Sequence, residues 1–181
     1  MSAVGHVVVI GGGAAGCAAA YYLRAAGVPV TLVEREGVGT QASGWSAGGL
    51  NPLHGVPEPL AALALESFRL HLALWPELER LTGQNLGARC ISLAMVAPDD
   101  AAIPPLLELR DVFEAADGFS ARWLDSAEFR ALEPRVAPGI AGALVTRGNG
   151  VLDSHRFTAA LAAAAQGFGA ALRIGTVAGI R

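Results

Sequence analysis

Cysteine and charge are both scarce in this sequence. The 181 residues include two cysteines, Cys17 and Cys90, which lie far apart with no second thiol or metal-ligand spacing beside either one. This usage predicts free thiols, no metal site and a reducing, cytoplasmic compartment. Only 16% of the residues are charged, the net charge is −3, and the basic residues form no cluster. We therefore expect no nucleic-acid partner and no binding to an anionic membrane surface.

A long apolar run that could cross a membrane is also missing. The charge-free stretch at residues 7–23 contains three consecutive glycines, and no lysine or arginine precedes it. A membrane-spanning helix needs about 20 apolar residues, and a secretory signal begins with a basic segment. We therefore expect this stretch to be neither a transmembrane segment nor a signal peptide.

What the sequence does contain is apolar and rich in glycine. Apolar residues make up 52% of the chain, and 23 residues are glycine. This composition is far from that of disordered proteins and predicts buried helices and strands. The length allows one domain, or two small domains assembled from distant parts of the sequence.

The first recognisable motif joins an apolar strand to a turn of glycines. Val7–Ile10 is a β-branched run without polar interruption, which is typical of a strand buried on both faces of a parallel sheet. It is followed by Gly11-x-Gly13-x-x-Gly16 and by an alanine-rich segment, residues 14–26, that predicts a helix. The three glycines allow a tight turn, close approach of the backbone to a pyrophosphate, and helix-to-strand packing. The N-terminus of the helix would then bind a diphosphate.

A second strand and an acidic residue complete this unit. Val28–Val33 predicts a strand that ends at Glu34, eighteen residues after Gly16. A carboxylate at this place can accept hydrogen bonds from ribose hydroxyls and would repel a 2′-phosphate, which disfavours NADP. Residues 7–34 therefore predict a dinucleotide-binding unit, and this pattern alone leaves FAD and NAD both open.

The loop that follows resembles one in a known family of flavoproteins. Residues 7–34 together with residues 37–52, GVGTQASGWSAGGLNP, resemble the start of the D-amino-acid oxidase/glycine oxidase (DAO) superfamily, in which a second small-residue loop wraps FAD. Covalent relatives carry a Trp-His-Ala-Ala-Gly-like run where this chain has Ser46 in place of the histidine, so the resemblance implies non-covalent FAD. The residues expected to bind the cofactor are Gly11, Gly13, Ala14, Ala15, Gly16, Glu34, Arg35, Thr40, Ser43, Ser46, Ala47, Gly48, Gly49 and Val177.

The rest of the chain predicts further helices and strands. A helix at residues 59–81 is expected to be mostly buried, with Pro76 marking a kink or a break into two helices. Asp153 is a good N-cap for a helix that runs to about Gln166. The other predicted elements are a strand at Leu86–Val96, helices at Ile103–Ala116 and Trp123–Leu132, a strand at Ile140–Val145 and a turn at 148–150.

The resemblance covers nearly the whole chain and implies its domain organisation. It implies an α/β fold in which residues 1–52 and 148–181 form a discontinuous, Rossmann-like FAD-binding domain around a parallel sheet. Residues 53–147 are then a helical segment and the start of an α+β substrate domain. In the family, the last helix returns the chain to the FAD-binding domain, supplies its third parallel strand and places a valine, here Val177, whose backbone contacts adenine.

Family members have two complete domains, and the usual size of two domains makes them roughly twice as long as this chain. The resemblance therefore implies an incomplete, N-terminal portion whose substrate-binding and catalytic residues lie in a later half, and we assign none here. Such a portion is expected to expose apolar surface made for the missing half.

The function that the resemblance implies is oxidation of an amino acid or amine C–N bond by hydride transfer to FAD. Residues 150–155 are similar to a run in L-2-hydroxyglutarate oxidases, so a 2-hydroxy acid substrate stays open, as does an inactive flavin-binding module. Residues 42–44 and 49–52 resemble the FAD domain of the bifunctional enzyme that modifies the tRNA wobble uridine. The electron acceptor and any homo-oligomer are undetermined. His54 is expected to be a solvated or structural histidine, and His155 to make local hydrogen bonds.

Overall fold

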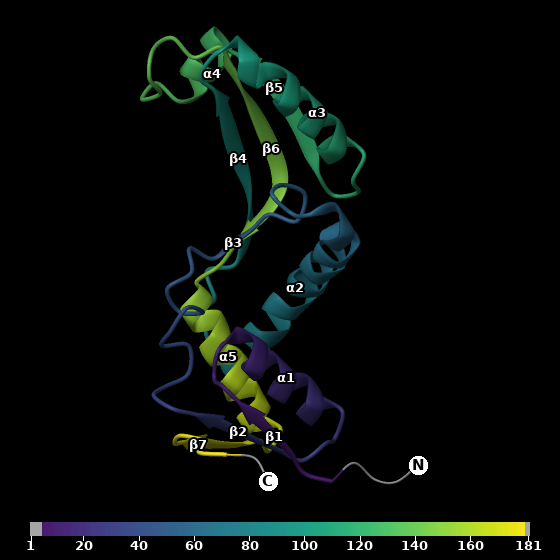
Figure 1. Cartoon of the computed structure of the whole chain (residues 1–181), viewed down its shortest axis with the longest axis vertical. Helices are drawn as coiled ribbons and strands as arrows, with labels where there is room; N and C mark the ends of the chain where they lie inside the picture. Colours follow the sequence, from purple (N-terminus) through teal and green to yellow (C-terminus); the bar gives the residue numbers. More distant parts are fainter. Residues whose placement is uncertain (1–4, 180–181) are drawn as a thin grey trace. The chain divides into compact units, whose positions relative to one another are not determined.

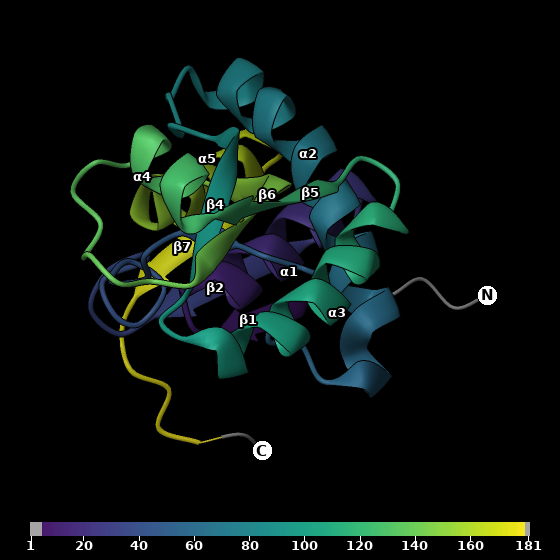
Figure 2. The same cartoon turned by 90° about the horizontal axis from the view of Figure 1, so that it is seen from above.

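The structure is a computed structural model that describes residues 5–179 (Figures 1 and 2). The chain divides into two compact units. The first comprises the chain up to Gly48, residues 70–88 and the chain from Leu152 onward, and the second comprises residues 49–69 and 89–151. Residues 70–88, which the sequence places in the helical segment, therefore cluster with the first unit.

The first unit is built on a parallel sheet with the order β1-β2-β7, formed by Val7–Ile10, Val30–Glu34 and Ala171–Ile174. The predicted third parallel strand is thus confirmed, and it pairs Thr31 with Ala171. Helices α1 (Ala14–Ala25) and α5 (Ser154–Gly167) pack against each other on one face of this sheet (Figure 1).

Strand β1 is not buried on both faces in this chain, contrary to the sequence-based expectation. Val30 and Leu32 of β2 are each 2% exposed, whereas Val8 and Ile10 of β1 are 55% and 54% exposed. Successive residues of a strand point to opposite faces, so the helices cover one face and leave apolar side chains on the other. The expected exposure of apolar surface is therefore present.

The turn between α1 and β2 explains why the strand begins at Val30 and not at Val28. Gly27 has a φ of +79° and donates its N–H to Arg24 O, while the N–H of Val28 bonds to Leu23 O. These two bonds form a Schellman motif, which satisfies carbonyls at the helix end with a glycine in the left-handed region. Val28 therefore belongs to the motif that caps the helix and not to the strand.

Helix α2 (Ala61–Thr82) follows a 3-10 turn at Glu58–Leu60 and is continuous through Pro76. Proline removes one backbone donor without ending the helix here. The prediction that this helix is mostly buried is wrong for the described chain. Leu78 is fully buried, but Leu63 is 64% exposed, and α2 therefore carries apolar side chains on an uncovered side.

The second unit is built on an antiparallel sheet in which β6 pairs with β3, β4 and β5. Helices α3 and α4 both pack on β5 and β6 (Figure 2). A small core of Leu124, Phe129, Ile140 and Ala143 lies beneath α4. The elements are β3 (Gly49–Leu50), β4 (Arg89–Ala97), a 3-10 turn (Asp100–Ala102), α3 (Ile103–Glu114), β5 (Ser120–Asp125), α4 (Ser126–Leu132) and β6 (Gly142–Val151).

The helix predicted at Trp123–Leu132 begins later than expected, because residues 123–125 belong to strand β5. Asp125 caps α4: its side chain accepts from the N–H of Glu128, and the Glu128 side chain accepts from the N–H of Asp125. This capping box marks the true start of the helix.

The turn predicted at residues 148–150 is wrong, because β6 runs through it to Val151. The pairing with β4 shifts register here, from Ile91 opposite Asn149 to Ser92 opposite Arg147. Gly148, with a φ of +96°, is the extra residue of a bulge. Asn149 is fully buried and donates to Thr146 Oγ1 at 2.9 Å. In a solvent-exposed turn, water could take the place of this hydrogen-bond partner.

Candidate functional site

Two of the predicted glycines are required by the backbone around the first turn. Gly11 has a φ of +106°, and its N–H bonds to Val33 O at 2.8 Å, which ties the end of β1 to β2. A Cβ at Gly16 would lie 1.9 Å from Gly11 O. Helix α1 therefore starts so close to the end of β1 that position 16 has no room for a side chain.

The N-terminus of α1 is capped by a side chain from another loop. Gly13 precedes the helix and offers no side chain, but Ser43 Oγ accepts the N–H of Ala14 at 3.0 Å. The first N–H groups of any α-helix have no acceptor within the helix, so those of Ala15 and Gly16 remain as donors for an anion.

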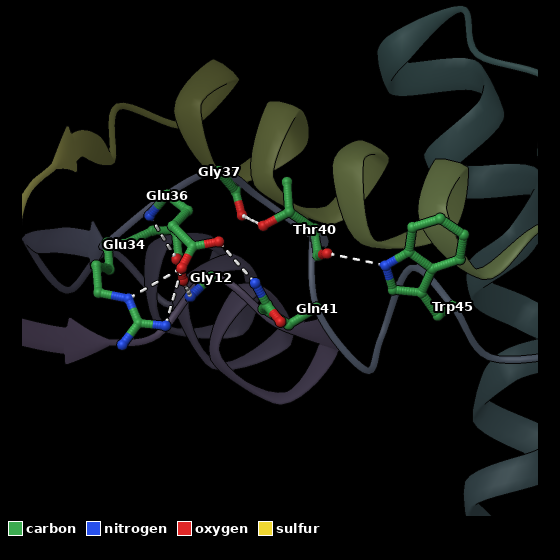
Figure 3. A network of polar contacts seen from close by, with 8 residues as sticks. Gly12, Glu34, Glu36, Gly37, Thr40, Gln41 and Trp45 are labelled. Carbon is green, nitrogen blue, oxygen red and sulfur yellow. Dashed lines mark hydrogen bonds and ion pairs between the residues drawn. The ribbon is translucent and has the colours of Figure 1, made fainter.

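Glu34 lies at the end of β2 with its carboxylate against the first glycine turn. Oε1 accepts the N–H of Glu36 at 2.9 Å, and Oε2 accepts the N–H of Gly12 at 2.5 Å (Figure 3). These backbone hydrogen bonds lower the pKa of the carboxyl group, the bond from Glu36 having the larger effect and the bond from Gly12 the next. The group is therefore ionised at neutral pH, and its remaining lone pairs can accept from hydroxyl groups.

The second loop is held by its own hydrogen bonds rather than being a free surface loop. Thr40 Oγ1 donates to Gly37 O at 2.9 Å, and Trp45 Nε1 donates to Thr40 O at 3.1 Å. Gln41 Nε2 reaches Glu36 Oε2 at 2.6 Å, as Figure 3 shows. The loop therefore presents a defined backbone next to Glu34.

Two of the hollows in the first unit adjoin at Glu34 and Gln41, which line both of them. The smaller hollow, of about 140 Å³, is lined by Gly12, Gly13, Glu34, Gly37, Gly39, Thr40, Gln41, Ala42 and Ser43. The larger one, of about 320 Å³, is lined by Ile10, Gly11, Val33, Glu34, Arg35, Gln41, Gly175, Thr176 and Val177.

The structure therefore brings half of the fourteen predicted positions together around these hollows, from three separate stretches of sequence. Gly11, Glu34, Arg35 and Val177 surround the larger hollow, and Gly13, Thr40 and Ser43 join Glu34 around the smaller one. Gln41 was missed by the sequence reasoning. Its position between Thr40 and Ser43, as a long polar side chain in a loop of small residues, is the signal that could have identified it.

Four predicted positions lie further along the chain, outside the residues that line these hollows. Ser46 Oγ accepts the N–H of Gly48 at 3.2 Å, Ala47 is exposed, and Gly49 pairs with Val151 in the second unit. Gly48 has a φ of +73°, and a Cβ there would lie 1.8 Å from the carbonyl oxygen of Leu152. The end of the loop is therefore packed tightly against the chain that leads into α5.

Comparison with known proteins identifies the family. Residues 6–181 match the DAO family, described as FAD dependent oxidoreductase. The chain belongs to this family. Its cofactor, FAD, is the one predicted from the second loop. Among residues 5–179, no group of three or more histidine, cysteine or acidic side chains could hold a metal ion. No helix in that range is both long enough and apolar enough to span a bilayer.

Several relatives show how much of a whole enzyme this chain represents. It is 32% identical over 170 residues to a 4-methylaminobutanoate oxidase (formaldehyde-forming) of Paenarthrobacter nicotinovorans, covering 93% of this chain and 20% of that protein. The structure is similar to glycine oxidase from Geobacillus kaustophilus, with a TM-score of 0.85 and 30% identity over 94% of this chain and 47% of that one.

A third relative carries a name that refers to tRNA. The chain is 37% identical over 172 residues to the tRNA 5-methylaminomethyl-2-thiouridine biosynthesis bifunctional protein of Burkholderia multivorans, covering 90% of this chain and 25% of that protein. The chain thus spans about half the length of the glycine oxidase and a quarter or less of these two curated relatives.

Proposed function

We propose that the two adjoining hollows hold the adenosine-diphosphate half of non-covalently bound FAD. Glu34 accepts the ribose hydroxyls, the N-terminus of α1 binds the diphosphate, and the backbone at Val177 lies beside adenine. The observation that carries this proposal is that both hollows share the Glu34 carboxylate, which is kept ionised by its hydrogen bonds. Ribose lies between adenine and diphosphate in FAD, so an acceptor for its hydroxyls has to lie between their two sites.

The absence of a side chain at Gly11 also leaves the room that such a ligand requires. The turn at Gly11 combines a positive φ with open space, since a Cβ there would meet nothing within 4 Å. The open space is available to a ligand that approaches the backbone closely. Ser46, Ala47 and Gly48 follow the smaller hollow in the sequence, and their proposed role is to bind the part of FAD nearer the flavin.

We propose further that the protein oxidises the C–N bond of an amino acid or amine. FAD supplies the hydride acceptor for such a reaction, and the protein binds and orients the small substrate against it. Support comes from the relatives, which include a methylaminobutanoate oxidase, D-amino acid dehydrogenases and glycine oxidases. The catalytic residues are not assigned to this chain.

A second candidate function is oxidation of a modified tRNA nucleoside. It is favoured by the 37% identity to the tRNA biosynthesis protein of Burkholderia multivorans. The net charge of −3 and the absence of a basic cluster in the sequence argue against tRNA as the substrate, because binding to a phosphate backbone depends on basic side chains. A 2-hydroxy acid is the alternative among small substrates.

The visible absorption spectrum of the purified protein tests the cofactor. Flavin bands that appear in the supernatant after denaturation would establish non-covalent FAD, and bands that stay with the protein would indicate a covalent link. A colourless protein that takes up no added FAD would overturn the proposal. Anaerobic bleaching of the bound flavin then ranks the substrates: glycine, N-methyl amines, D-amino acids, 2-hydroxy acids and modified tRNA. Bleaching by tRNA or 2-hydroxy acids alone would refute the amine reaction.

A further inference from the structure

The first turn of α5 makes hydrogen bonds to the second loop through two side chains. Ser154 Oγ donates to Ser46 O at 2.9 Å, and His155 Nδ1 lies 3.3 Å from Gly39 O. A carbonyl oxygen only accepts, so His155 carries its proton on Nδ1 when it makes this bond. Their partners precede them by 108 and 116 residues. The sequence-based expectation that His155 bonds locally is therefore wrong.

The second loop also packs closely against the first turn of α5. A Cβ at Gly39 would lie 3.3 Å from His155 Nδ1, and a Cβ at Gly44 would lie 3.1 Å from the same atom. Further along, the N–H of Leu152 bonds to Gly48 O at 3.1 Å. The chain from Leu152 to His155 thus contacts the loop at its beginning, middle and end.

Gly39 connects this turn to the proposed cofactor site. Its carbonyl oxygen faces His155, and its N–H donates to Gly12 O at 2.9 Å in the first glycine turn. Gly39 has a φ of +68° and lines the smaller hollow together with Ser43. A shift of Gly39 would therefore change the hollow that Ser43 also lines.

We propose that Ser154 and His155 are positioning residues, which hold the second loop in the shape that binds FAD. This inference rests on the proposed function. In the described part of the chain neither side chain lines the two hollows, so both act through the loop carbonyls that they bind. His155 acts at Gly39, beside the diphosphate end of the site, and Ser154 acts at Ser46, on the side of the flavin.

The two residues therefore have different expected effects on two ligands, FAD and ADP. His155→Ala should weaken both, because Gly39 lines the hollow proposed for the diphosphate. Ser154→Ala should weaken FAD and leave ADP unchanged, because Ser46 lies outside that hollow. A single hydrogen bond of this kind corresponds to a change of about 3- to 10-fold in the dissociation constant.

The test is a titration of the full-length apoprotein with FAD and, separately, with ADP. His155→Asn places an amide N–H near the position of Nδ1 and should restore most of the affinity that His155→Ala loses. Gln166→Ala, at an exposed position in the last turn of the same helix, is the matched control and should bind both ligands like the wild type. Thermal unfolding of each apoprotein shows whether a variant has lost its fold.

The outcomes separate the two proposals. Wild-type protein that binds neither ligand would overturn the proposed function and this inference with it. Wild-type protein that binds both, with His155→Ala and Ser154→Ala binding equally well, would overturn the inference alone. Equal weakening of both ligands by both variants and by His155→Asn would show general loosening of the fold, and would also count against specific positioning.

Discussion

Replacing Gly16 with alanine introduces a single methyl group at the closest approach between α1 and the turn before it. The new Cβ would lie 1.9 Å from Gly11 O, whereas real Cβ contacts shorter than 3.0 Å essentially do not occur. The start of α1 and the end of β1 would therefore have to separate by about 1.1 Å, the difference between these two distances. Gly11 O is a backbone atom, and the position of a Cβ is fixed by its own backbone, so no side-chain rotation can relieve the contact.

The expected cost is about 1–3 kcal/mol in the free energy of unfolding, the range for an overpacked site. The melting temperature should fall by about 2–4 °C for each kcal/mol in a protein of this size. The affinity for FAD should fall as well, because the displaced N–H groups at the start of α1 are those proposed to bind the diphosphate. Urea unfolding and an FAD titration measure the two effects separately.

Gly167→Ala is the matched control for this substitution. Gly167 is also helical, at the end of α5, but a Cβ there would meet nothing within 4 Å. Alanine should be neutral or stabilise the protein there by up to about 1 kcal/mol, because it loses less conformational entropy than glycine in a helix. A Gly16→Ala protein as stable as Gly167→Ala, with wild-type FAD affinity, would refute the steric argument.

Three further outcomes are expected. Glu34 has a lowered pKa in the folded state, so its stabilising contribution is present above its ordinary pKa of 4.5 and is lost as the pH falls through the lower folded value. The free energy of unfolding of Glu34→Gln should therefore depend less on pH in this range than that of the wild type, and an unchanged pH profile would contradict this. Burial, with a smaller effect of Glu34, raises the pKa of the Cys17 thiol to about 11. Iodoacetamide at about pH 8 should therefore label the exposed Cys90 alone, as read by mass spectrometry, and equal labelling of both cysteines in the native protein would contradict this. Asp153 caps α5 by accepting the N–H of Arg156, so Asp153→Ala should cost about 1 kcal/mol in thermal unfolding and Asp153→Asn much less, whereas equal losses would exclude capping.

The parts of the fold that were predictable from sequence depend on neighbours in the chain. The strand, glycine turn and helix at the start follow from spacing, since Gly11 and Gly16 must meet across a single turn. The Asp153 cap is equally local, because its partner is three residues away. Such features can be identified without knowing the rest of the molecule.

The parts that were missed depend on partners far away in sequence. Gly148 and its neighbours look like a turn, and only the pairing of β6 with β4 shows that they form a bulge. Trp123 could not be assigned to a strand without β6 beside it. The link from His155 to Gly39 crosses 116 residues and has no signal in spacing or composition.

The pairing of β2 with β7 has a consequence for the order in which the molecule assembles. Thr31 pairs with Ala171, and the second unit is encoded entirely between these residues. Closing such a distant parallel pair costs much chain entropy and is slow compared with local folding. On the ribosome, the Glu34 side of the larger hollow is made early, whereas Val177 appears only after the second unit has been synthesised. The site is therefore complete only after the second unit has been made, and FAD can stabilise the chain only from that point.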